Sequence, residues 1–121
     1  MNNLYNYKAT VVRIVDGDTL DIEVDLGFNI HVDMRVRLLG VDTPEVYGVK
    51  KESEEYRKGK LASDFTARWL EAINNKVEIH THKDKQGKYG RYLVLVLNPI
   101  NADSLGEALV ESGNAVKVLY D

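Results

Sequence analysis

The 121-residue sequence contains no cysteine and only two prolines. The lack of cysteine excludes disulfides, thiolate metal ligands and cysteine nucleophiles. No apolar run approaches the roughly 20 residues that a membrane-spanning helix requires. The N-terminus also lacks the basic segment followed by an apolar segment that marks a secretory signal. We therefore expect a cytoplasmic protein or a mature secreted form, and no membrane partner.

An excess of positive charge is also absent, since 16 basic residues face 19 acidic ones and the net charge is −3. A protein that holds nucleic acid by overall charge is expected to be basic. A polyanionic partner must therefore be bound by a local group of cations. The 44% share of hydrophobic residues is typical of globular proteins, and the length fits a single domain over residues 1–121.

Alternating apolar residues predict three β-strands in the first third of the chain, at residues 8–15, 19–26 and 30–38. In the third strand, Arg35 and Arg37 share the face opposite the apolar residues. The side chains that we expect to be buried in the second and third strands are Leu20, Ile22, Val24, Leu26, Val32, Met34, Val36 and Leu38.

A helix is predicted next, because apolar residues recur every fourth position from Leu61 to Ile73. We expect its apolar side, which includes Phe65 and Trp69, to face the sheet, and the helix to end near Asn74. Residues 46–60 before it are polar and mixed in charge. They are predicted to form a mobile surface loop that leads into the helix.

Two further strands are predicted at residues 76–82 and 91–98, and the second is apolar on both faces, as a central strand is. A short helix is predicted over residues 102–113, with Gly113 as its stop signal. The fold class is therefore β-rich α+β. Five strands with a helix between the third and fourth, and a short helix after the fifth, are typical of an OB-type barrel, which commonly binds nucleic acid or sugars.

Two possible metal motifs are weak. The segment that begins at Asp16 resembles the start of an EF-hand, but its sixth and twelfth positions hold Asp21 and Gly27, so an EF-hand is excluded. His80 and His82 lie two residues apart on one predicted strand, as zinc ligands can. No third ligand of obvious type is nearby, so solvated histidines are favoured.

The basic loop between the last two predicted strands contains Lys83, Lys85, Lys88, Tyr89 and Arg91. Such a loop fits phosphate binding, with a base stacked on the tyrosine. A solvated hairpin tip explains the same residues equally well, and the residue pattern leaves both interpretations open.

The stretch RLLGVDTPE, residues 37–45, carries more charge than a connecting turn needs. Pro44 restricts Thr43 to an extended conformation, which fixes the direction of the Thr43 carbonyl. Together with Asp42, and with Asp18 from the first turn, this carbonyl gives three possible oxygen ligands at one end of the barrel. Such a set suits Ca²⁺ better than zinc.

Two arginines and a glutamate complete this candidate site. Arg37 and Arg91 have forked donors that match phosphate oxygens. Glu45 lies two residues beyond Thr43 and is suited to orient or deprotonate a water molecule.

Three separated motifs, VVRIVDGDTL, RLLGVDTPE and KYGR, resemble those of the staphylococcal nuclease (thermonuclease) family in order and separation. The resemblance extends over residues 8–120. It implies an OB-type fold and Ca²⁺ as a cofactor. It also implies cleavage of the 5′ P–O bond in nucleic acid, which leaves 3′-phosphate ends.

The resemblance also implies roles for individual residues of this chain. The implied Ca²⁺ ligands are Asp18, Asp42 and the carbonyl of Thr43, with Asp16 next to them. The implied catalytic residues are Arg37, Glu45 and Arg91, and the implied nucleotide contacts are Lys88 and Tyr89. Tyr120 matches a further substrate tyrosine if one extra residue is allowed in the preceding segment.

We therefore expect a calcium-dependent nuclease that hydrolyses single- and double-stranded DNA and RNA with low sequence specificity. The alternative is a non-catalytic OB-type module that binds nucleic acid or a protein partner. This chain keeps Arg37, Glu45 and Arg91 together, which favours the enzyme. A third interpretation, a calcium-binding structural domain, leaves the two arginines unexplained.

Family members usually continue with another helix beyond the point where this sequence ends. We expect that without it some apolar side chains near the C-terminus are uncovered, namely those among Val110, Val116, Val118 and Leu119. We therefore predict a marginally stable monomer that either pairs through this surface, as a homo-oligomer, or is markedly stabilised by Ca²⁺ together with a nucleotide.

Overall fold

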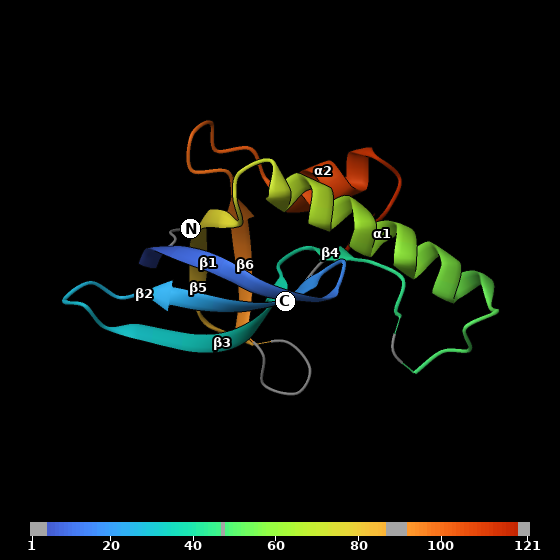
Figure 1. The fold of residues 1–121 in the computed structure, drawn as a ribbon, viewed down its shortest axis with the longest axis horizontal. Helices are drawn as coiled ribbons and strands as arrows, with labels where there is room; N and C mark the ends of the chain where they lie inside the picture. The colour runs from blue at the N-terminus through green and yellow to red at the C-terminus, as the bar shows by residue number, and fades with distance from the viewer. Residues whose placement is uncertain (1–4, 47, 87–91, 119–121) are drawn as a thin grey trace.

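The computed structural model describes residues 5–46, 48–86 and 92–118. Its strands are β1 (Tyr5–Asp16), β2 (Thr19–Asp25), β3 (His31–Leu38), β4 (Val41–Asp42), β5 (Lys76–Gln86), β6 (Tyr92–Leu97) and β7 (Val116–Lys117). Its helices are α1 (Glu54–Glu71) and α2 (Leu105–Glu111) (Figure 1).

Five of the strands form a closed barrel in the order β1-β2-β3-β6-β5, with β5 returning to β1. All the pairs are antiparallel except β3 with β6, which is parallel. The helix α1 lies between the third and fourth barrel strands along the chain, and α2 follows the fifth. The predicted five-stranded OB-type barrel is therefore confirmed.

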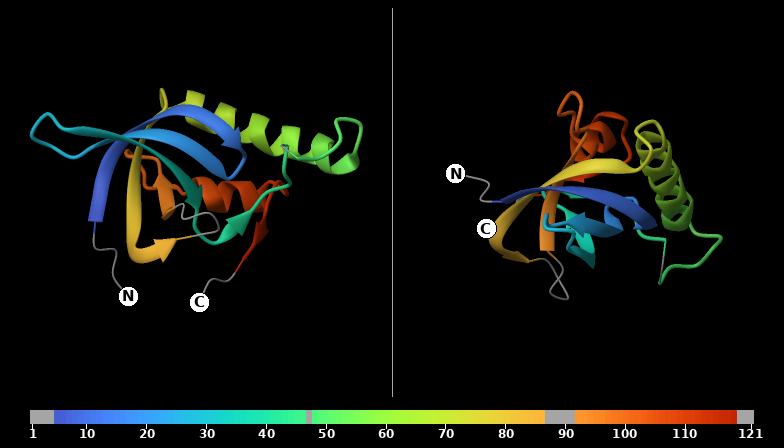
Figure 2. Two further views of the ribbon diagram at one scale, coloured as in Figure 1. Left: turned by 90° about the horizontal axis from the view of Figure 1, so that it is seen from below. Right: turned by 60° about the vertical axis from the view of Figure 1, so that its left-hand side comes forward.

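The barrel interior is filled by the alternating apolar residues of its strands. Leu20, Ile22 and Val36 are almost completely buried, as expected. The expectation was wrong for Leu26 and Val32, which are 40% and 39% exposed. These two residues lie on the β2–β3 hairpin, which extends beyond the rest of the barrel (Figures 1 and 2), so no opposite wall covers them.

The helix α1 begins at Glu54, so the predicted loop is wrong for residues 54–60. Its first turn is stabilised locally: Ser53 caps the helix, its hydroxyl oxygen accepting a hydrogen bond from the Tyr56 amide at 3.1 Å. Arg57 donates to the carboxylate of Glu54 one turn earlier. These polar interactions stabilise the first turn of α1, although residues 54–60 have no apolar periodicity. At its other end, Asn74 has a left-handed backbone conformation, as a helix terminus near that residue requires.

The buried side of α1 also differs from the prediction. Phe65, Trp69 and Ile73 pack against the core while partly buried, and Leu61 is exposed. The residues of α1 that are fully buried are small ones and one leucine: Gly59, Ala62, Thr66 and Leu70. Small residues let the helix backbone approach the barrel closely.

The helix α2 packs beside α1 and against β6 (Figure 2). Leu105 and Leu109 are fully buried, and Gly113 has a left-handed backbone conformation after the helix, as predicted. None of the helices in the described part of the chain has the length and apolar character needed to cross a membrane.

The short strand β7 pairs with β4 and brings the C-terminal segment against the loop after β3. Of the apolar residues expected to lie uncovered there, Val116 is exposed, whereas Val110 and Val118 are half-buried. Leu119 lies outside the described residues.

Candidate functional site

Asp18 is the buried centre of the candidate site. It follows the tight turn at Gly17 that joins β1 to β2, and it is 4% exposed. One carboxylate oxygen, Oδ1, accepts a hydrogen bond from the hydroxyl of Thr19 at 3.0 Å. The other, Oδ2, accepts one from the backbone amide of Thr43, also at 3.0 Å. Asp18 thus connects the first turn of the chain to the loop after β3.

Arg37 approaches the same carboxylate from the end of β3. Its Nη2 atom donates to Oδ2 of Asp18 at 3.0 Å and to Oδ1 of Asp42 at 2.5 Å. The side chain of Arg37 is 18% exposed and that of Asp42 is 52% exposed. A single cationic nitrogen therefore lies between two carboxylates, one buried and one open to solvent.

The loop after β3 takes its shape from Gly40, whose positive φ of 83° is unfavourable for other residues. The carbonyl of Gly40 accepts a hydrogen bond from the Val118 amide at 2.9 Å, next to the β4–β7 pair. Thr43 follows and is buried, at 5% exposed. Its hydroxyl oxygen has no hydrogen-bond partner among the described residues.

Asp16 holds the far end of this loop. Its Oδ1 atom accepts a hydrogen bond from the Val46 amide at 3.1 Å. Glu45, immediately before, has an exposed side chain. Asp16 and Asp18 together therefore fix the loop at two points, while the Glu45 carboxylate is left open to solvent.

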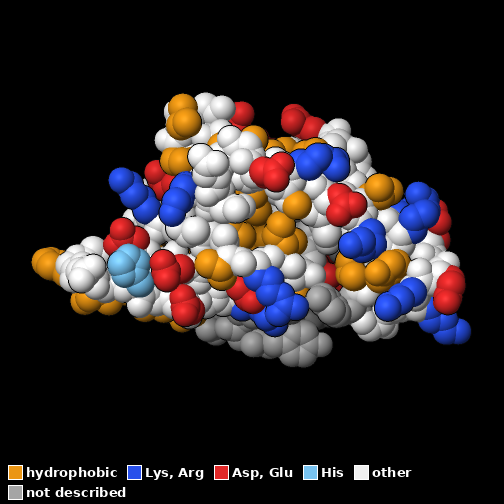
Figure 3. All heavy atoms as spheres, in the orientation of Figure 1, with side chains coloured by type: hydrophobic (Ala, Val, Ile, Leu, Met, Phe, Trp, Pro, Cys, Tyr) orange, Lys and Arg blue, Asp and Glu red, His pale blue; other side chains and the backbone are white. Residues whose placement is uncertain are grey.

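A cleft of about 590 Å³ adjoins this loop. It is lined by Asp42, Thr43, Pro44, Glu45, Glu54, Glu55, Lys58, Gly113, Asn114, Ala115 and Val116. Four of these side chains are acidic and one is basic, so the cleft carries negative charge. Figure 3 shows basic and acidic side chains mixed over the N-terminal end of α1, on the right of that view. A phosphate group would not enter such a cleft without an accompanying cation.

The donor set at this site fits a hard cation. Asp18 and Asp42 each direct a carboxylate oxygen at the same cationic nitrogen, so one positive centre can reach both. The buried Thr43 hydroxyl adds an oxygen without a partner among the described residues. In those residues no group of three or more acidic or histidine side chains is arranged to hold a metal ion. A cation here would therefore depend on backbone and water oxygens as well.

The structure thus brings together four of the predicted site residues, Asp18, Arg37, Asp42 and Thr43, with Glu45 on the adjoining cleft. The other predicted site residues lie outside the described part of the chain: Lys88, Tyr89, Arg91 and Tyr120. His80 contacts the carboxylate of Glu78 at 2.5 Å, as a half-buried polar side chain. The side chain of His82, the other histidine of that pair, lies outside what the structure describes.

Several residues that shape the site were missed in the sequence. Thr66 of α1 donates its hydroxyl to the carbonyl of Gly17 at 2.9 Å. A Cβ atom on Gly17 would lie 2.9 Å from the Cβ of Ala62, and one on Gly59 would lie 2.6 Å from the carbonyl oxygen of Glu45. The signal was the spacing of small residues at positions 59, 62 and 66, which share one side of a helix.

Two carboxyl groups outside the Asp18–Arg37–Asp42 cluster have clearly lowered pKa values. The guanidinium of Arg35 hydrogen-bonds to Asp21 on the outside of the barrel and lowers the pKa of that carboxyl. Arg57 lowers the pKa of Glu54 in the same way at the start of α1.

Residues 35–121 match the model of the family described as staphylococcal nuclease homologue. The chain is 36% identical to a thermonuclease of Staphylococcus hyicus over 120 residues. These residues are 99% of this chain and 64% of that protein.

Two further relatives match over smaller shares of this chain and of their own length. A thermonuclease of Staphylococcus intermedius is 42% identical over 86 residues, which are 71% of this chain and 46% of that protein. An uncharacterised protein of Methanocaldococcus jannaschii is 31% identical over 126 aligned positions, 91% of this chain and 58% of that protein. The chain therefore spans less than two thirds of the length of each relative.

Proposed function

The chain belongs to the staphylococcal nuclease homologue family, and on this basis we propose that it is a nuclease, a hydrolase of phosphodiester bonds in nucleic acid. One observation carries the proposal: Arg37 Nη2 lies between the carboxylates of Asp18 and Asp42. A forked phosphate-binding cation and a pair of cation-binding carboxylates thus occupy the same few ångströms. A fold that only binds a partner has no need of this combination.

We propose Ca²⁺ as the cofactor, held by Asp18, Asp42 and the carbonyl of Thr43, with water completing the coordination. Oxygen ligands from carboxylates and carbonyls suit Ca²⁺, whereas zinc prefers the nitrogen and sulfur ligands that this site lacks among its described residues. When bound, the ion would neutralise phosphate charge and stabilise the charge that develops in the transition state.

The residues of the chain would then act on the phosphate and the attacking water. Arg37, and Arg91 from the segment before β6, would donate forked hydrogen bonds to the phosphate oxygens. These hydrogen bonds would strengthen as the oxygens gain negative charge in the transition state. Glu45, exposed on the cleft, would accept a proton from water as that water attacks phosphorus, while the 5′ P–O bond breaks and the leaving 5′ oxygen takes up a proton from solvent. Lys88, Tyr89 and Tyr120 are proposed to contact the nucleotide.

The proposed substrates are single- and double-stranded DNA and RNA, cut with low sequence specificity. Contacts to phosphate carry no sequence information. The proposed products have 3′-phosphate ends, as in the family. Self-association through the surface around Val116 stays a prediction, which sedimentation of the free protein tests.

A nicking assay tests the proposed function. Supercoiled DNA and a labelled single strand are incubated with the protein and Ca²⁺, then with excess chelator, beside a Glu45→Gln variant. We expect cutting with Ca²⁺, none with chelator, and much slower cutting by the variant. Undiminished cutting in chelator would contradict the proposed cofactor. Binding without any cutting would favour the alternative, a non-catalytic nucleic-acid-binding module.

A further inference from the structure

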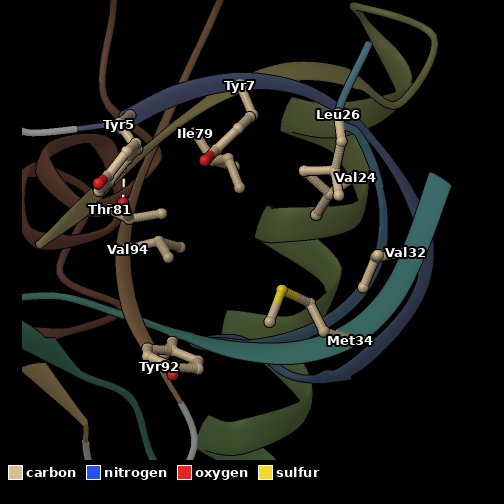
Figure 4. Close-up of a pocket in the computed structure, with 10 residues that line it drawn as sticks. All are labelled: Tyr5, Tyr7, Val24, Leu26, Val32, Met34, Ile79, Thr81, Tyr92 and Val94. Carbon is tan, nitrogen blue, oxygen red and sulfur yellow. Dashed lines mark hydrogen bonds between the residues drawn. The ribbon is translucent and has the colours of Figure 1, made fainter. Parts of the chain in front are cut away.

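The outer face of the barrel carries further arginines beside the candidate site. Figure 4 shows Val32 and Met34 of β3 pointing into an apolar pocket at the mouth of the barrel. None of the residues that line this pocket is charged. Since successive side chains of a strand point to opposite faces, Arg35 and Arg37 both lie on the outside of the barrel. The cations of β3 therefore belong to its outer face.

Arg35 is the neighbour of Arg37 on this face. The two positions are two residues apart along β3, or roughly 7 Å, which is close to the spacing of successive phosphates in a nucleic-acid strand. Asp21 accepts hydrogen bonds from Nε of Arg35 at 2.6 Å and from Nη2 at 3.1 Å. These bonds use two of the five N–H groups of the guanidinium and fix its direction. The Arg35 side chain is 44% exposed, so a phosphate can approach it from solvent.

Arg13 of β1 completes this group. The strand register places Arg13 opposite Asp21, and Asp21 opposite Arg35. Directly paired residues share one face of a sheet, with their Cβ atoms about 5 Å apart. The pKa of Asp21 is lowered mainly by its hydrogen bond to Arg35 and also by the charge of Arg13, as expected for close neighbours. We call these three residues the outer arginine row; two guanidiniums and one carboxylate give it an excess of one positive charge.

The next row toward the β2–β3 hairpin has the opposite charge. It contains Thr10, Glu23 and Asp33, which follow the same register across the three strands. In Figure 3, acidic side chains gather over the hairpin on the left, and a group of basic ones lies nearer the centre of the barrel. A phosphate beyond Arg35 would meet the two carboxylates of this row. The outer face thus suits one phosphate next to Arg37 and not a longer track.

We propose that the outer arginine row binds a second phosphate of the nucleic-acid strand, the neighbour of the phosphate that Arg37 holds. The inference rests on the proposed function and adds a substrate subsite to it. At the cut linkage the cation is needed, because the carboxylates of Asp18 and Asp42 flank the single guanidinium of Arg37. The outer arginine row is positive by itself, so it holds its phosphate without Ca²⁺. The enzyme therefore prefers substrates that carry a phosphate next to the cut linkage.

The alternative is that Arg35 and Asp21 form only a surface ion pair. Such a pair is neutral and contributes little to stability. It does not account for Arg13, which lies on the other side of Asp21 and leaves the row with an excess of positive charge. The two interpretations differ in how strongly salt should weaken the binding of a nucleic-acid strand.

Two variants and a matched control test the subsite. Arg35→Gln and Arg13→Gln each remove one cation of the outer arginine row and keep a polar side chain at an exposed position. Arg68→Gln removes the same charge from an exposed position in the last turn of α1, which is not part of the barrel. Thermal melting shows whether each variant is folded. If one outer-row variant fails to fold, the other carries the test.

The first measurement is binding of a labelled oligothymidylate in chelator, by fluorescence anisotropy at several salt concentrations. Each phosphate contact on a single strand contributes about 0.7 to the slope of log K against log salt concentration. We expect Arg35→Gln and Arg13→Gln each to reduce the slope by about this amount, and Arg68→Gln to keep the slope of the wild type. Unchanged slopes in the outer-row variants would overturn the inference and leave a surface ion pair.

The second measurement tests whether the second phosphate is next to the cut linkage. Cutting of a thymidine dinucleotide with Ca²⁺ is compared with cutting of the same dinucleotide that carries a terminal phosphate at its 5′ or its 3′ end. We expect one of the terminal phosphates to raise kcat/KM about tenfold in the wild type and in Arg68→Gln, but not in Arg35→Gln.

No gain from either terminal phosphate in a wild type that cuts the dinucleotide would overturn the inference, and so would an equal gain in Arg35→Gln. If none of the substrates is cut, the proposed nuclease function fails instead. The salt dependence of binding in chelator would then still decide whether the outer arginine row holds a phosphate.

Discussion

The guanidinium of Arg37 and the carboxylate of Asp18 form an ion pair at 3.0 Å in which the Asp18 side chain is 6% exposed and that of Arg37 is 18% exposed. Water screens such a pair poorly, so each partner depends on the other to offset the cost of burial. The same carboxylate accepts the Thr43 amide. The ion pair therefore joins the β1–β2 turn, the end of β3 and the loop after β3 at one point.

Replacing Arg37 by lysine is expected to abolish most of the activity while preserving the charge. Lysine is a point charge that cannot span two phosphate oxygens, so turnover should fall on the order of hundredfold. Oligonucleotide binding should change less. The measurement is kcat and Kd for one single-stranded substrate. A lysine variant that cuts at a near-normal rate would show that Arg37 does not act as a forked donor.

The ion pair also links Arg37 to the bound cation. In Arg37→Ala the buried Asp18 has lost its positive partner, so the melting temperature without Ca²⁺ should fall, and Ca²⁺ should raise it more than in the wild type. Arg35→Ala is the matched control, because Arg35 pairs with Asp21 outside the site. Equal calcium shifts in wild type and Arg37→Ala would contradict the proposal that the ion and Arg37 share these carboxylates.

Substitutions of the two proposed carboxylate ligands, Asp42 and Asp18, should have different effects on the stability of the fold. Asp42 is half exposed, so Asp42→Asn should remove calcium binding with little change in the free energy of unfolding. Asp18 is buried and accepts from Thr19, Arg37 and Thr43, so Asp18→Asn should also cost about 1–3 kcal/mol. Calorimetric calcium titration and urea unfolding measure both effects. A calcium affinity in Asp42→Asn equal to that of the wild type would exclude Asp42 as a ligand.

The alternation along the strands, with a helix between the third and the fourth, was enough to predict the barrel and to place Asp18 near the 37–45 stretch at one end of it. Strand alternation places a residue on one face, and the pairing of neighbouring strands follows from their short connections. It does not say how far the opposite wall extends. For this reason Leu26 and Val32 were expected to be buried, although they lie at the rim of an open pocket.

The start of α1 was missed for a different reason. Residues 54–60 carry almost no apolar side chains, so no amphipathic pattern exists to find. Their helix depends on the Ser53 cap and on close packing at Gly59, which is a tertiary contact with Glu45. A glycine that is needed for close approach looks in the sequence like a helix breaker.

The Asp21–Arg35 pair predicts a small dependence of stability on pH. Arg35 lowers the pKa of Asp21 in the folded state, so the stabilisation is present above the unfolded value and is lost as the pH falls through the lower folded value. The pair is partly exposed, so Asp21→Asn should cost only about 0.2–1 kcal/mol at neutral pH.

The difference between wild type and Asp21→Asn should shrink once the pH falls below about 4. Urea unfolding across this range measures it. Asp103→Asn serves as control, because Asp103 is exposed and forms no ion pair among the described residues. A difference that stays constant down to the lowest pH would mean that the carboxylate charge has no part in the effect.

Gly59 gives the strongest test of how α1 positions the candidate site. In an ordinary helix, replacing glycine by alanine stabilises the protein by about 1 kcal/mol. Here the new Cβ would lie 2.6 Å from the carbonyl oxygen and 2.9 Å from the carbonyl carbon of Glu45. These are backbone atoms, so the loop that carries Glu45 must move. We expect Gly59→Ala to destabilise the fold by about 1–3 kcal/mol and to slow turnover.

The matched control is Gly106→Ala in α2, where the nearest atom to the new Cβ is Cγ1 of Val41 at 3.4 Å. That contact is close to ordinary, so Gly106→Ala should leave stability unchanged or raise it, with little loss of turnover. Urea unfolding and cutting rates of both variants decide the matter. If Gly59→Ala is as stable and as active as Gly106→Ala, the loop tolerates displacement, and close packing of α1 against the Glu45 backbone has no part in holding the site.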